Sequence, residues 1–328
     1  MKSLLAIAFA TVYGLATHFM FVFLNNFLAI MSITFLGLLP VSIGFLTVAL
    51  TPKEKITSGS TAFFKPWFTC GVLLGITVLL KMEGIICWLM IYPLFATLAG
   101  FGGLIAYHTL KRRSRYKDSD CLDDDDWEKP DTLSVSLALL APIFIGLIEG
   151  DRASWPRELY LSKTVTIAAV PTAVWSQLAH INEVGPKEKH TALANFLGFP
   201  RHLCTTLDTL AVGGKRMAYY ENGLYFKETI VQLVPAQLLV LDVETDPEHI
   251  PPTVLDEHIV IGGKHIDILQ DVYRLEQLPD GNTRLTLSSR FHINTPFNWY
   301  ASIWAEFLMS DILQGELDLI KARATPGF

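Results

Sequence analysis

This 328-residue sequence is short of charged residues, which make up 18% of the chain. Ordinary soluble proteins contain about 25% Asp, Glu, Lys and Arg. The shortage is concentrated at the start, because Ser3 to Thr51 contains none of these four residue types. Hydrophobic residues make up 51% of the chain, and the mean hydropathy is +0.36. Residues 1–150 are therefore typical of a membrane-embedded region, whereas residues 151–328 have the composition of a globular domain.

Other absences exclude several classes of protein. The four cysteines (Cys70, Cys87, Cys121 and Cys204) show no metal-ligand spacing, and two of them lie in apolar runs, so a disulfide framework is not expected. A net charge of -6 argues against a nucleic-acid partner. The sequence lacks a Gly-x-Ser-x-Gly elbow, a Gly-Lys-Ser/Thr phosphate loop and a Cys-x-x-Cys pair. We therefore expect no cofactor and no metal.

Hydrophobic runs predict an all-α transmembrane region of four or five helices in residues 1–150, since about 20 apolar residues cross a bilayer. The uncharged run from Ser3 to Thr51 is long enough for two spans with a turn at Asn25–Asn26. A cleaved signal peptide is the alternative for the first span, but no small-x-small cleavage site is convincing. Gly100, Gly102 and Gly103 are read as the usual glycine content of membrane helices rather than as a packing motif. The expected spans are approximately 4–24, 28–50, 63–82, 84–110 and 132–149.

Basic residues orient these spans, because Lys and Arg are enriched in cytoplasmic loops. The segment 111–117 is strongly basic, and Lys2, Lys53 and Lys55 fall on the same side if the spans alternate. The sequence therefore predicts a multi-pass protein of a prokaryotic-type inner membrane, with loop 111–131 in the cytoplasm.

Two features near this loop leave alternatives open. If 132–149 spans, the C-terminal domain lies on the outer, periplasmic face, which we favour. If that stretch only lies in the interface, the domain is cytoplasmic. The acidic run Asp123–Asp126 is interpreted as solvated charge rather than a metal site, since it lacks the glycine and terminal glutamate of a calcium loop.

The C-terminal half has an α+β pattern: one strand, two short helices, several antiparallel strands and a long final helix. Asn222–Gly223, Gly262–Gly263 and Pro279–Asn282 are turn signals. The expected strands are 159–170, 209–220, 224–234, 237–245, 258–261, 264–278 and 283–293, and the expected helices are 171–178, 190–197 and 297–324.

The final helix, 297–324, is expected to begin at Thr295–Pro296, a capping residue followed by a proline suited to the first turn. At about 100° per residue, one broad arc is apolar but contains Asp311, while Met309, Leu313 and Glu316 lie outside it. The arc consists of Tyr300, Trp304, Phe307, Leu308, Ile312, Gly315, Leu319 and Ala322.

Several local patterns resemble one superfamily over residues 157–325. They are Pro171-x-x-Val174-Trp175, Leu255-Asp256-Glu257-His258, Gly262-Gly263-Lys264, Tyr273-Arg274-Leu275-Glu276, Gly281-x-Thr283-Arg284-Leu285 and Asn298-x-Tyr300-Ala301-x-x-Trp304. They resemble the START-like superfamily (SRPBCC, related to polyketide cyclases and dehydrases). The resemblance implies a helix-grip fold, in which an antiparallel sheet surrounds the long C-terminal helix and an apolar cavity lies between them.

A cavity of that kind would be lined from both elements, and the alternative is a filled core. The carboxylate of Asp311, paired with Arg290, would bind a ligand head group; its alternative role is structural, in an ion pair or as a cap for the loop 198–201. Glu228, Asp271 and His292 could form an acid/base set. A zinc triad of His258, His265 and His292 has no local spacing to support it. The candidate ligand-binding residues are Tyr300, Trp304, Phe307, Leu308, Asp311, Arg290, Tyr225 and Glu228.

Three functions are compatible with this pattern. The first is a membrane-anchored domain that binds a hydrophobic small molecule or lipid for sensing or transfer, with the proline-containing segment 246–257 as a lid. The second is an accessory or scaffold subunit of a larger membrane complex, with membrane-protein partners. The third is an enzyme of cyclase or hydrolase type. The sequence favours them in that order, with the lipid bilayer as the first partner.

Overall fold

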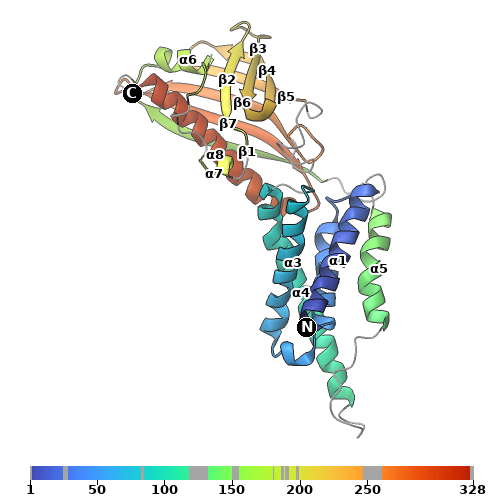
Figure 1. Cartoon of the computed structure of the whole chain (residues 1–328). Helices are drawn as coiled ribbons and strands as arrows, with labels where there is room; N and C mark the ends of the chain where they lie inside the picture. Colours follow the sequence, from blue (N-terminus) through green and yellow to red (C-terminus); the bar gives the residue numbers. More distant parts are fainter. Residues whose placement is uncertain are drawn as a thin grey trace. The chain divides into compact units, whose positions relative to one another are not determined.

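The computed structural model describes residues 2–24, 29–82, 85–117, 132–149, 155–179, 181–185, 188, 192–196, 199–246 and 261–325 (Figure 1). The chain divides into two compact units, Met1–Ser154 and Trp155–Phe328. We call them unit 1 and unit 2 and describe each by itself.

Unit 1 is a bundle of apolar helices. In the part of the chain that is described, four helices are long and apolar enough to cross a membrane, and Thr34–Ala49 is a shorter apolar helix. The expected turn at Asn25–Asn26 and the acidic run Asp123–Asp126 lie outside the described residues. The elements are α1 (Lys2–Phe23), the π-helical η1 (Thr34–Leu38), α2 (Leu39–Ala49), the 3₁₀-helix η2 (Lys53–Lys55), α3 (Gly59–Leu79), α4 (Ile85–Lys117) and α5 (Thr132–Glu149).

Polar contacts hold α5 to the bundle, although few of its residues are buried. The Tyr13 hydroxyl of α1 donates a hydrogen bond to the carbonyl of Leu139, 3.0 Å away. The Glu149 carboxylate accepts hydrogen bonds from the backbone N–H groups of Ile33 and Thr34, at 2.7 and 2.8 Å. A carboxylate at a helix start satisfies otherwise unpaired N–H groups and suits the helix dipole. Together these contacts make α5 run alongside α1 in the same direction.

Basic side chains gather at one end of unit 1. The Lys65 ammonium of α3 donates to the hydroxyl of Ser3 at 2.8 Å, which places the first turns of α1 and α3 together. The short helix Lys53–Lys55 joins α2 to α3 at this end, and α4 reaches Lys111 and Arg112 there (Figure 1). The bundle therefore groups the same basic residues that the spacing of the spans predicts on one side.

Glycines allow α2 and α4 to cross at backbone contact. A Cβ atom added to Gly44 would lie 1.8 Å from the carbonyl oxygen of Ala99, and one added to Gly102 would lie 2.0 Å from that of Val41. A Cβ on Gly103 would lie 2.2 Å from the carbonyl oxygen of Ala62 on α3. The interpretation of Gly102 and Gly103 as ordinary composition is therefore wrong, because close helix packing requires a glycine at both positions.

Unit 2 is an α+β unit built on one seven-stranded antiparallel sheet with the order β1-β7-β6-β5-β4-β3-β2. The helices α6, α7 and α8 accompany the sheet, and α8 packs on β1 and β7. The elements are β1 (Pro156–Ile167), α6 (Pro171–Ala179), α7 (Ala192–Phe196), β2 (His202–Leu207), β3 (Lys215–Tyr220), η3 (Glu221–Gly223), β4 (Tyr225–Val234), β5 (Leu238–Thr245), β6 (Ile266–Gln277), β7 (Thr283–Asn294) and α8 (Asn298–Ala324). This arrangement is compatible with the expected helix-grip fold.

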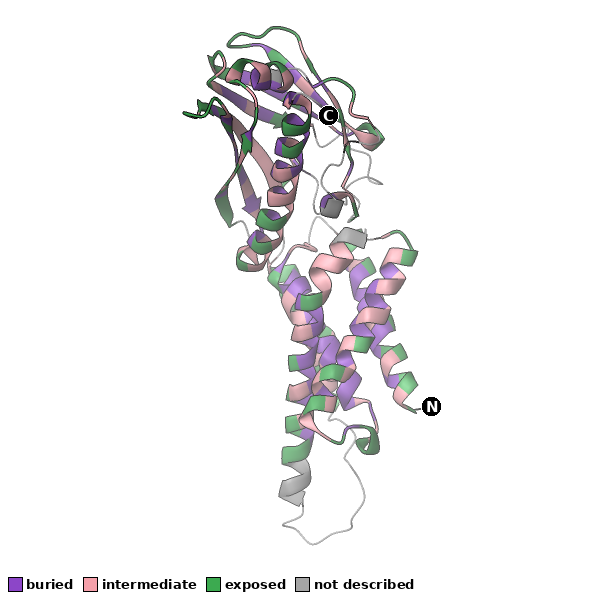
Figure 2. Cartoon of the chain, turned by 90° about the vertical axis from the view of Figure 1, so that its left-hand side faces the viewer, coloured by how far each residue is buried: buried purple, intermediate pink, exposed green. Residues whose placement is uncertain are grey.

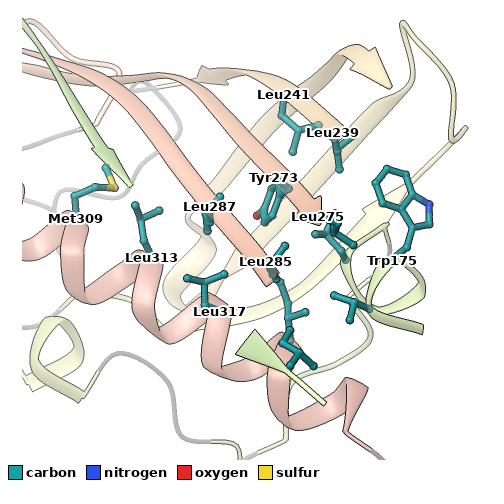
Figure 3. Close-up of a cluster of buried hydrophobic side chains, with 14 of the residues drawn as sticks. Trp175, Leu239, Leu241, Tyr273, Leu275, Leu285, Leu287, Met309, Leu313 and Leu317 are labelled. Carbon is teal, nitrogen blue, oxygen red and sulfur yellow. The ribbon is translucent and has the colours of Figure 1, made fainter. Parts of the chain in front are cut away.

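Side chains alternate between two faces along each strand, and one face forms the core with α8 (Figure 2). Leu285, Leu287 and Phe291 of β7 are buried in one hydrophobic cluster with residues of α8. Figure 3 shows Leu285 and Leu287 facing Leu313 and Leu317 of α8. Since burying one such side chain contributes about 1.5–3 kcal/mol, this cluster is the main source of stability in unit 2.

Two sequence-based boundaries differ from the structure. The strand expected at 209–220 begins only at Lys215, and β2 (His202–Leu207), which pairs with β3, was not expected. Gly213 has a φ of +89°, and a Cβ on Gly214 would lie 1.9 Å from the carbonyl oxygen of Thr209. These two glycines lie in the turn between β2 and β3, which agrees with the expectation that the Gly213–Gly214 pair is a hairpin or bulge position.

The expected orientation of the last helix was wrong. The stripe that faces the sheet contains Met309 and Leu313, which the apolar arc had left outside. Phe307, assigned to the arc, is 48% exposed. Both sides of α8 are apolar because α6 and α7 also pack against it, so periodicity alone did not select the inner side. Thr295 does not cap the helix; instead, its N–H donates to the Asn298 side chain at 2.9 Å.

Gly102→Ala tests the close crossing in unit 1. We expect it to lower the free energy of unfolding of the bundle by about 1–3 kcal/mol, the usual effect of overpacking. Gly75→Ala is the matched control, because nothing lies within 4 Å of an added Cβ there. Alanine favours a helix over glycine by about 1 kcal/mol, so the control should be neutral or stabilised. Thermal unfolding in detergent measures both, and equal midpoints would contradict the close packing.

Candidate functional site

The inner face of the sheet in unit 2 carries charged side chains beside the hydrophobic core. Strand register places Arg216 of β3 opposite Glu228 of β4, and Asp271 of β6 opposite Ser289 of β7. Glu316 comes from α8. Charged groups are rarely buried without partners, so this cluster is the most unusual feature of the interior.

Arg216 is the centre of the cluster, and only 2% of it is exposed. One guanidinium nitrogen lies 2.6 Å from Oε2 of Glu228, and the other terminal nitrogen lies 3.8 Å from Oε1 of Glu316. The Tyr273 hydroxyl donates to the same Glu316 oxygen. The guanidinium carbon also lies 5.8 Å from the centroid of the Tyr273 ring, a cation–π contact. Strands β3, β4 and β6 and helix α8 are thus joined through one cation.

Some polar atoms of the cluster have no hydrogen-bond partner among the described residues. One of them is Nε of Arg216. Asp271 and Ser289 lie opposite each other in the register of β6 and β7, and a hydrogen bond from the Ser289 side chain lowers the pKa of Asp271. A buried donor left unpaired costs about 1–3 kcal/mol, which makes Nε of Arg216 a candidate contact for a bound molecule.

The charges of the cluster do not balance, because three carboxyl groups share one guanidinium. Burial raises the pKa of Asp271 to about 7, and the nearby Glu228 and Glu316 carboxylates add to the rise. Burial also raises the pKa of Glu228, although Arg216 opposes this. With all three carboxyl groups ionised, the cluster has two more negative than positive charges, and with one proton retained on Asp271 it still has one more, so both states favour an incoming cation.

A small cavity adjoins Glu316. Its volume is about 30 Å³, and a water molecule needs roughly 10–15 Å³ on the same measure, so a small polar group fits. Aromatic rings form part of its wall: the Tyr220 ring lies 6.2 Å from that of Phe199 and 5.2 Å from that of Phe226. The lining residues are Phe199, Pro200, His202, Tyr220, Ile312, Gly315 and Glu316.

The structure brings only one of the predicted polar ligand-binding residues, Glu228, into this cluster. Tyr225 lies on the other face of the sheet, where its hydroxyl is 3.4 Å from Asp246 and its ring is 5.7 Å from the Lys227 ammonium. Arg290 is also on the outer face, 3.6 Å from Glu158. The expected Arg290–Asp311 pair is therefore wrong, because odd and even positions of β7 face opposite ways.

Asp311 has a structural contact. Its carboxylate accepts a hydrogen bond from the backbone N–H of Ala194, 2.9 Å away, in the first turn of α7. This matches the alternative of a backbone cap, although the capped segment is α7 and not the loop 198–201.

The four apolar candidates on α8 lie away from the sheet. Tyr300, Trp304 and Leu308 are partly exposed and Phe307 is largely exposed, so they do not line the cavity beside Glu316. Whether any of them contacts a ligand stays a prediction.

The proposed acid/base set is also divided. Asp271 and Glu228 face inward, but His292 faces outward and pairs in register with Asp267. Within the described ranges, no group of three or more His, Cys, Asp or Glu could hold a metal ion, and His258 of the proposed zinc triad lies outside them.

The sequence did not predict three residues of the cluster as site residues: Arg216, Tyr273 and Glu316. Arg216 could have been found, because it alternates with Ala218 and Tyr220 on a strand whose other face is exposed. Glu316 could not, since its inward position depends on how α8 is rotated about its axis.

No family model matches the chain, and no curated protein matches it. Several solved structures are similar over about half of it. The Zhui aromatase/cyclase from Streptomyces sp. R1128 is 14% identical, covering 51% of this chain and 94% of that one, with a TM-score of 0.33. Truncated norcoclaurine synthase from Thalictrum flavum is 12% identical, covering 54% and 98%, with a TM-score of 0.32. A protein from Arthrobacter aurescens is 20% identical, covering 51% and 86%, with a TM-score of 0.32. At these values the likeness says nothing about ligand or reaction.

Asp271→Asn tests the raised pKa. A carboxyl with a pKa of about 7 when folded and 3.8 when unfolded binds more protons in the folded state between these values, so stability falls as pH rises through that window. The variant lacks this loss, so from pH 5 to pH 8 its free energy of unfolding should rise relative to the wild type by at most about 3 kcal/mol, which corresponds to the roughly two pH units crossed below a pKa of about 7. Hydrogen exchange of the β6 and β7 amides at each pH measures the difference in free energy of unfolding between the variant and the wild type. A difference that does not change with pH would contradict the raised pKa of Asp271.

Asp311→Ala tests the cap on α7. Loss of a capping carboxylate costs about 1 kcal/mol, so amides of residues 192–196 should exchange several-fold faster. The control is Asp318→Ala, an exposed carboxylate on the same helix whose partner is Gln314. Equal exchange in both variants would show that Asp311 does not hold α7.

Proposed function

We propose that this chain is a membrane-anchored START-like protein whose unit 2 binds a small amphipathic molecule with an amine or other cationic polar group. The observation that carries this proposal is the surplus of buried carboxyl groups around Arg216, next to a cavity with aromatic walls. Carboxylates and aromatic rings together are the usual means by which proteins recognise ammonium groups.

The polar group would enter the cavity and contact Glu316. Its positive charge would replace the proton that the cluster otherwise keeps, and the Tyr220 ring would face the cation. A charge-assisted hydrogen bond contributes about 1.5–3 kcal/mol, enough to select an amine over a neutral group of equal size.

The apolar part of the ligand needs more space. Pockets for drug-sized molecules measure about 300–1,000 Å³, roughly tenfold more than this cavity. The rim residues Phe199 and Ile312 would have to move to admit an alkyl chain. The expected lid, 246–257, lies outside the described residues apart from Asp246. Among amphipathic molecules with a cationic group, a lipid would be the largest ligand. Because unit 1 would anchor the chain in the membrane, the bound molecule would be sensed or transferred there.

The anchor would be unit 1, inserted in a prokaryotic-type inner membrane. The basic end of the bundle supports a cytoplasmic position for Lys2, Lys53–Lys55 and Lys111. Because α5 runs parallel to α1, its last residue, Glu149, lies at the opposite end, and unit 2 would follow on the periplasmic side.

An accessory subunit is the second candidate. The observation in its favour is the packed apolar core, in which Phe291, Leu241 and Leu317 are at most 1% exposed. A scaffold needs no cavity, and its membrane-protein partners would copurify. The cyclase or hydrolase alternative has less support, since His292 does not join Glu228 and Asp271.

Hexylammonium binding tests the proposed ligand class. We expect the full chain in nanodiscs to bind hexylammonium but not hexanoate, and Glu316→Gln to weaken binding at least about tenfold, since a charged hydrogen bond is lost. Glu306→Gln, an exposed glutamate on the same helix, should bind like the wild type. Isothermal titration calorimetry measures affinity, and native mass spectrometry identifies copurified molecules. Equal weak binding of both ions, with copurifying protein partners, would favour the accessory subunit.

A further inference from the structure

The first turns of α8 expose an apolar stripe. Trp299, Ile303 and Phe307 follow one another at every fourth residue and are 60%, 61% and 48% exposed. Residues four apart on a helix lie on the same side, so the three side chains form a continuous surface. The half-buried Trp304 extends it, because its ring lies 6.2 Å from that of Phe307.

The backbone of Trp155, at the start of unit 2, lies beside the first turn of α8. Its side chain is 60% exposed. Its backbone N–H donates to the Asn294 side chain at 2.7 Å, and its carbonyl accepts from the Asn298 amide in the first turn of α8. These hydrogen bonds hold Trp155 beside the beginning of the helix. We define the aromatic patch as Trp155, Trp299, Ile303 and Phe307.

The chemistry of the aromatic patch differs from that of the rest of α8. Exposed positions in the second half of the helix include Asp318 and Lys321, as expected for a surface in water. Tryptophan is enriched where a bilayer meets water, since its ring has an apolar body and one N–H donor. A contiguous exposed apolar surface of this kind marks an interaction site.

Chain length makes a bilayer the natural partner. Only residues 150–154 separate Glu149, the last residue of α5, from Trp155. The six residue steps from Glu149 to Trp155 span at most roughly 22 Å even when fully extended. If α5 crosses a membrane, the covalent chain alone keeps Trp155 close to the end of that span, within reach of the interfacial layer.

We propose that the aromatic patch inserts into the interfacial layer of the bilayer that unit 1 spans. The start of α8 then lies at the membrane surface, with its indole rings at the level of the lipid head groups. This accounts for the exposed apolar side chains in the first turns of α8, because Trp299, Ile303 and Phe307 would contact lipid. The proposal depends on the membrane anchor but not on the amine ligand.

Site-directed spin labelling tests this contact. Ile303→Cys and Phe307→Cys are labelled separately in the full chain, in nanodiscs of phosphatidylcholine and phosphatidylglycerol. Asp318→Cys, exposed on the same helix, is the control, and the signal of the labelled unmutated chain is subtracted. Collision rates with oxygen, which concentrates in lipid, and with a water-soluble nickel chelate report the surroundings of each label.

We expect the ratio of oxygen to nickel collisions to be several-fold higher at 303 and 307 than at 318. Equal ratios at all three positions would overturn the proposal, because the patch would then face water. Labels at 303 and 307 that are shielded from both reagents would also overturn it, since a protein surface would cover the patch. Hexylammonium binding is measured on the same samples, so the two proposals can fail independently.

Discussion

The ion pair between Arg216 and Glu228 is the constraint on which unit 2 depends. An arginine cannot lose its charge in a protein, so a buried guanidinium must be paired. The pairing fixes the register of β3 against β4, because a slip of one residue would turn Arg216 to the outer face. It also sets the position of α8, because Glu316 approaches the same guanidinium and accepts a hydrogen bond from the Tyr273 hydroxyl.

Because the buried charges gather around Arg216, the interior of unit 2 has an apolar part and a polar part. One part is apolar, where Leu285 and Leu287 of β7 meet Leu313 and Leu317 of α8 (Figure 3). The other part holds the charged cluster and the small cavity beside Glu316. The apolar part stabilises the fold, and the polar part keeps the Nε–H of Arg216 without a partner among the described residues, so a bound molecule or water could satisfy it. A ligand site in unit 2 is therefore expected at the polar end.

Close contacts of different kinds organise unit 1. Glycines bring α2 and α4 to backbone distance, and the Glu149 carboxylate on α5 accepts hydrogen bonds from the N–H groups of Ile33 and Thr34 at the start of η1. Apolar burial discriminates little between helices in a membrane, because lipid is as apolar as leucine. Packing of small residues and hydrogen bonding of polar ones then decide which helices are neighbours.

The sequence by itself determined the elements whose signal is local. Uncharged runs defined the apolar helices, turn residues such as Asn222–Gly223 separated the strands, and a long amphipathic helix ended the chain. Only the tertiary structure decided which side of α8 faces the sheet, that Arg216 and Glu316 meet, and that Arg290 and Tyr225 point outward. The reason is physical. Strand alternation and the helical period indicate which residues share a face, but they do not indicate which face packs against the rest of the domain. That choice depends on contacts between residues such as Arg216 and Glu316, which are 100 positions apart and meet only after the chain has folded.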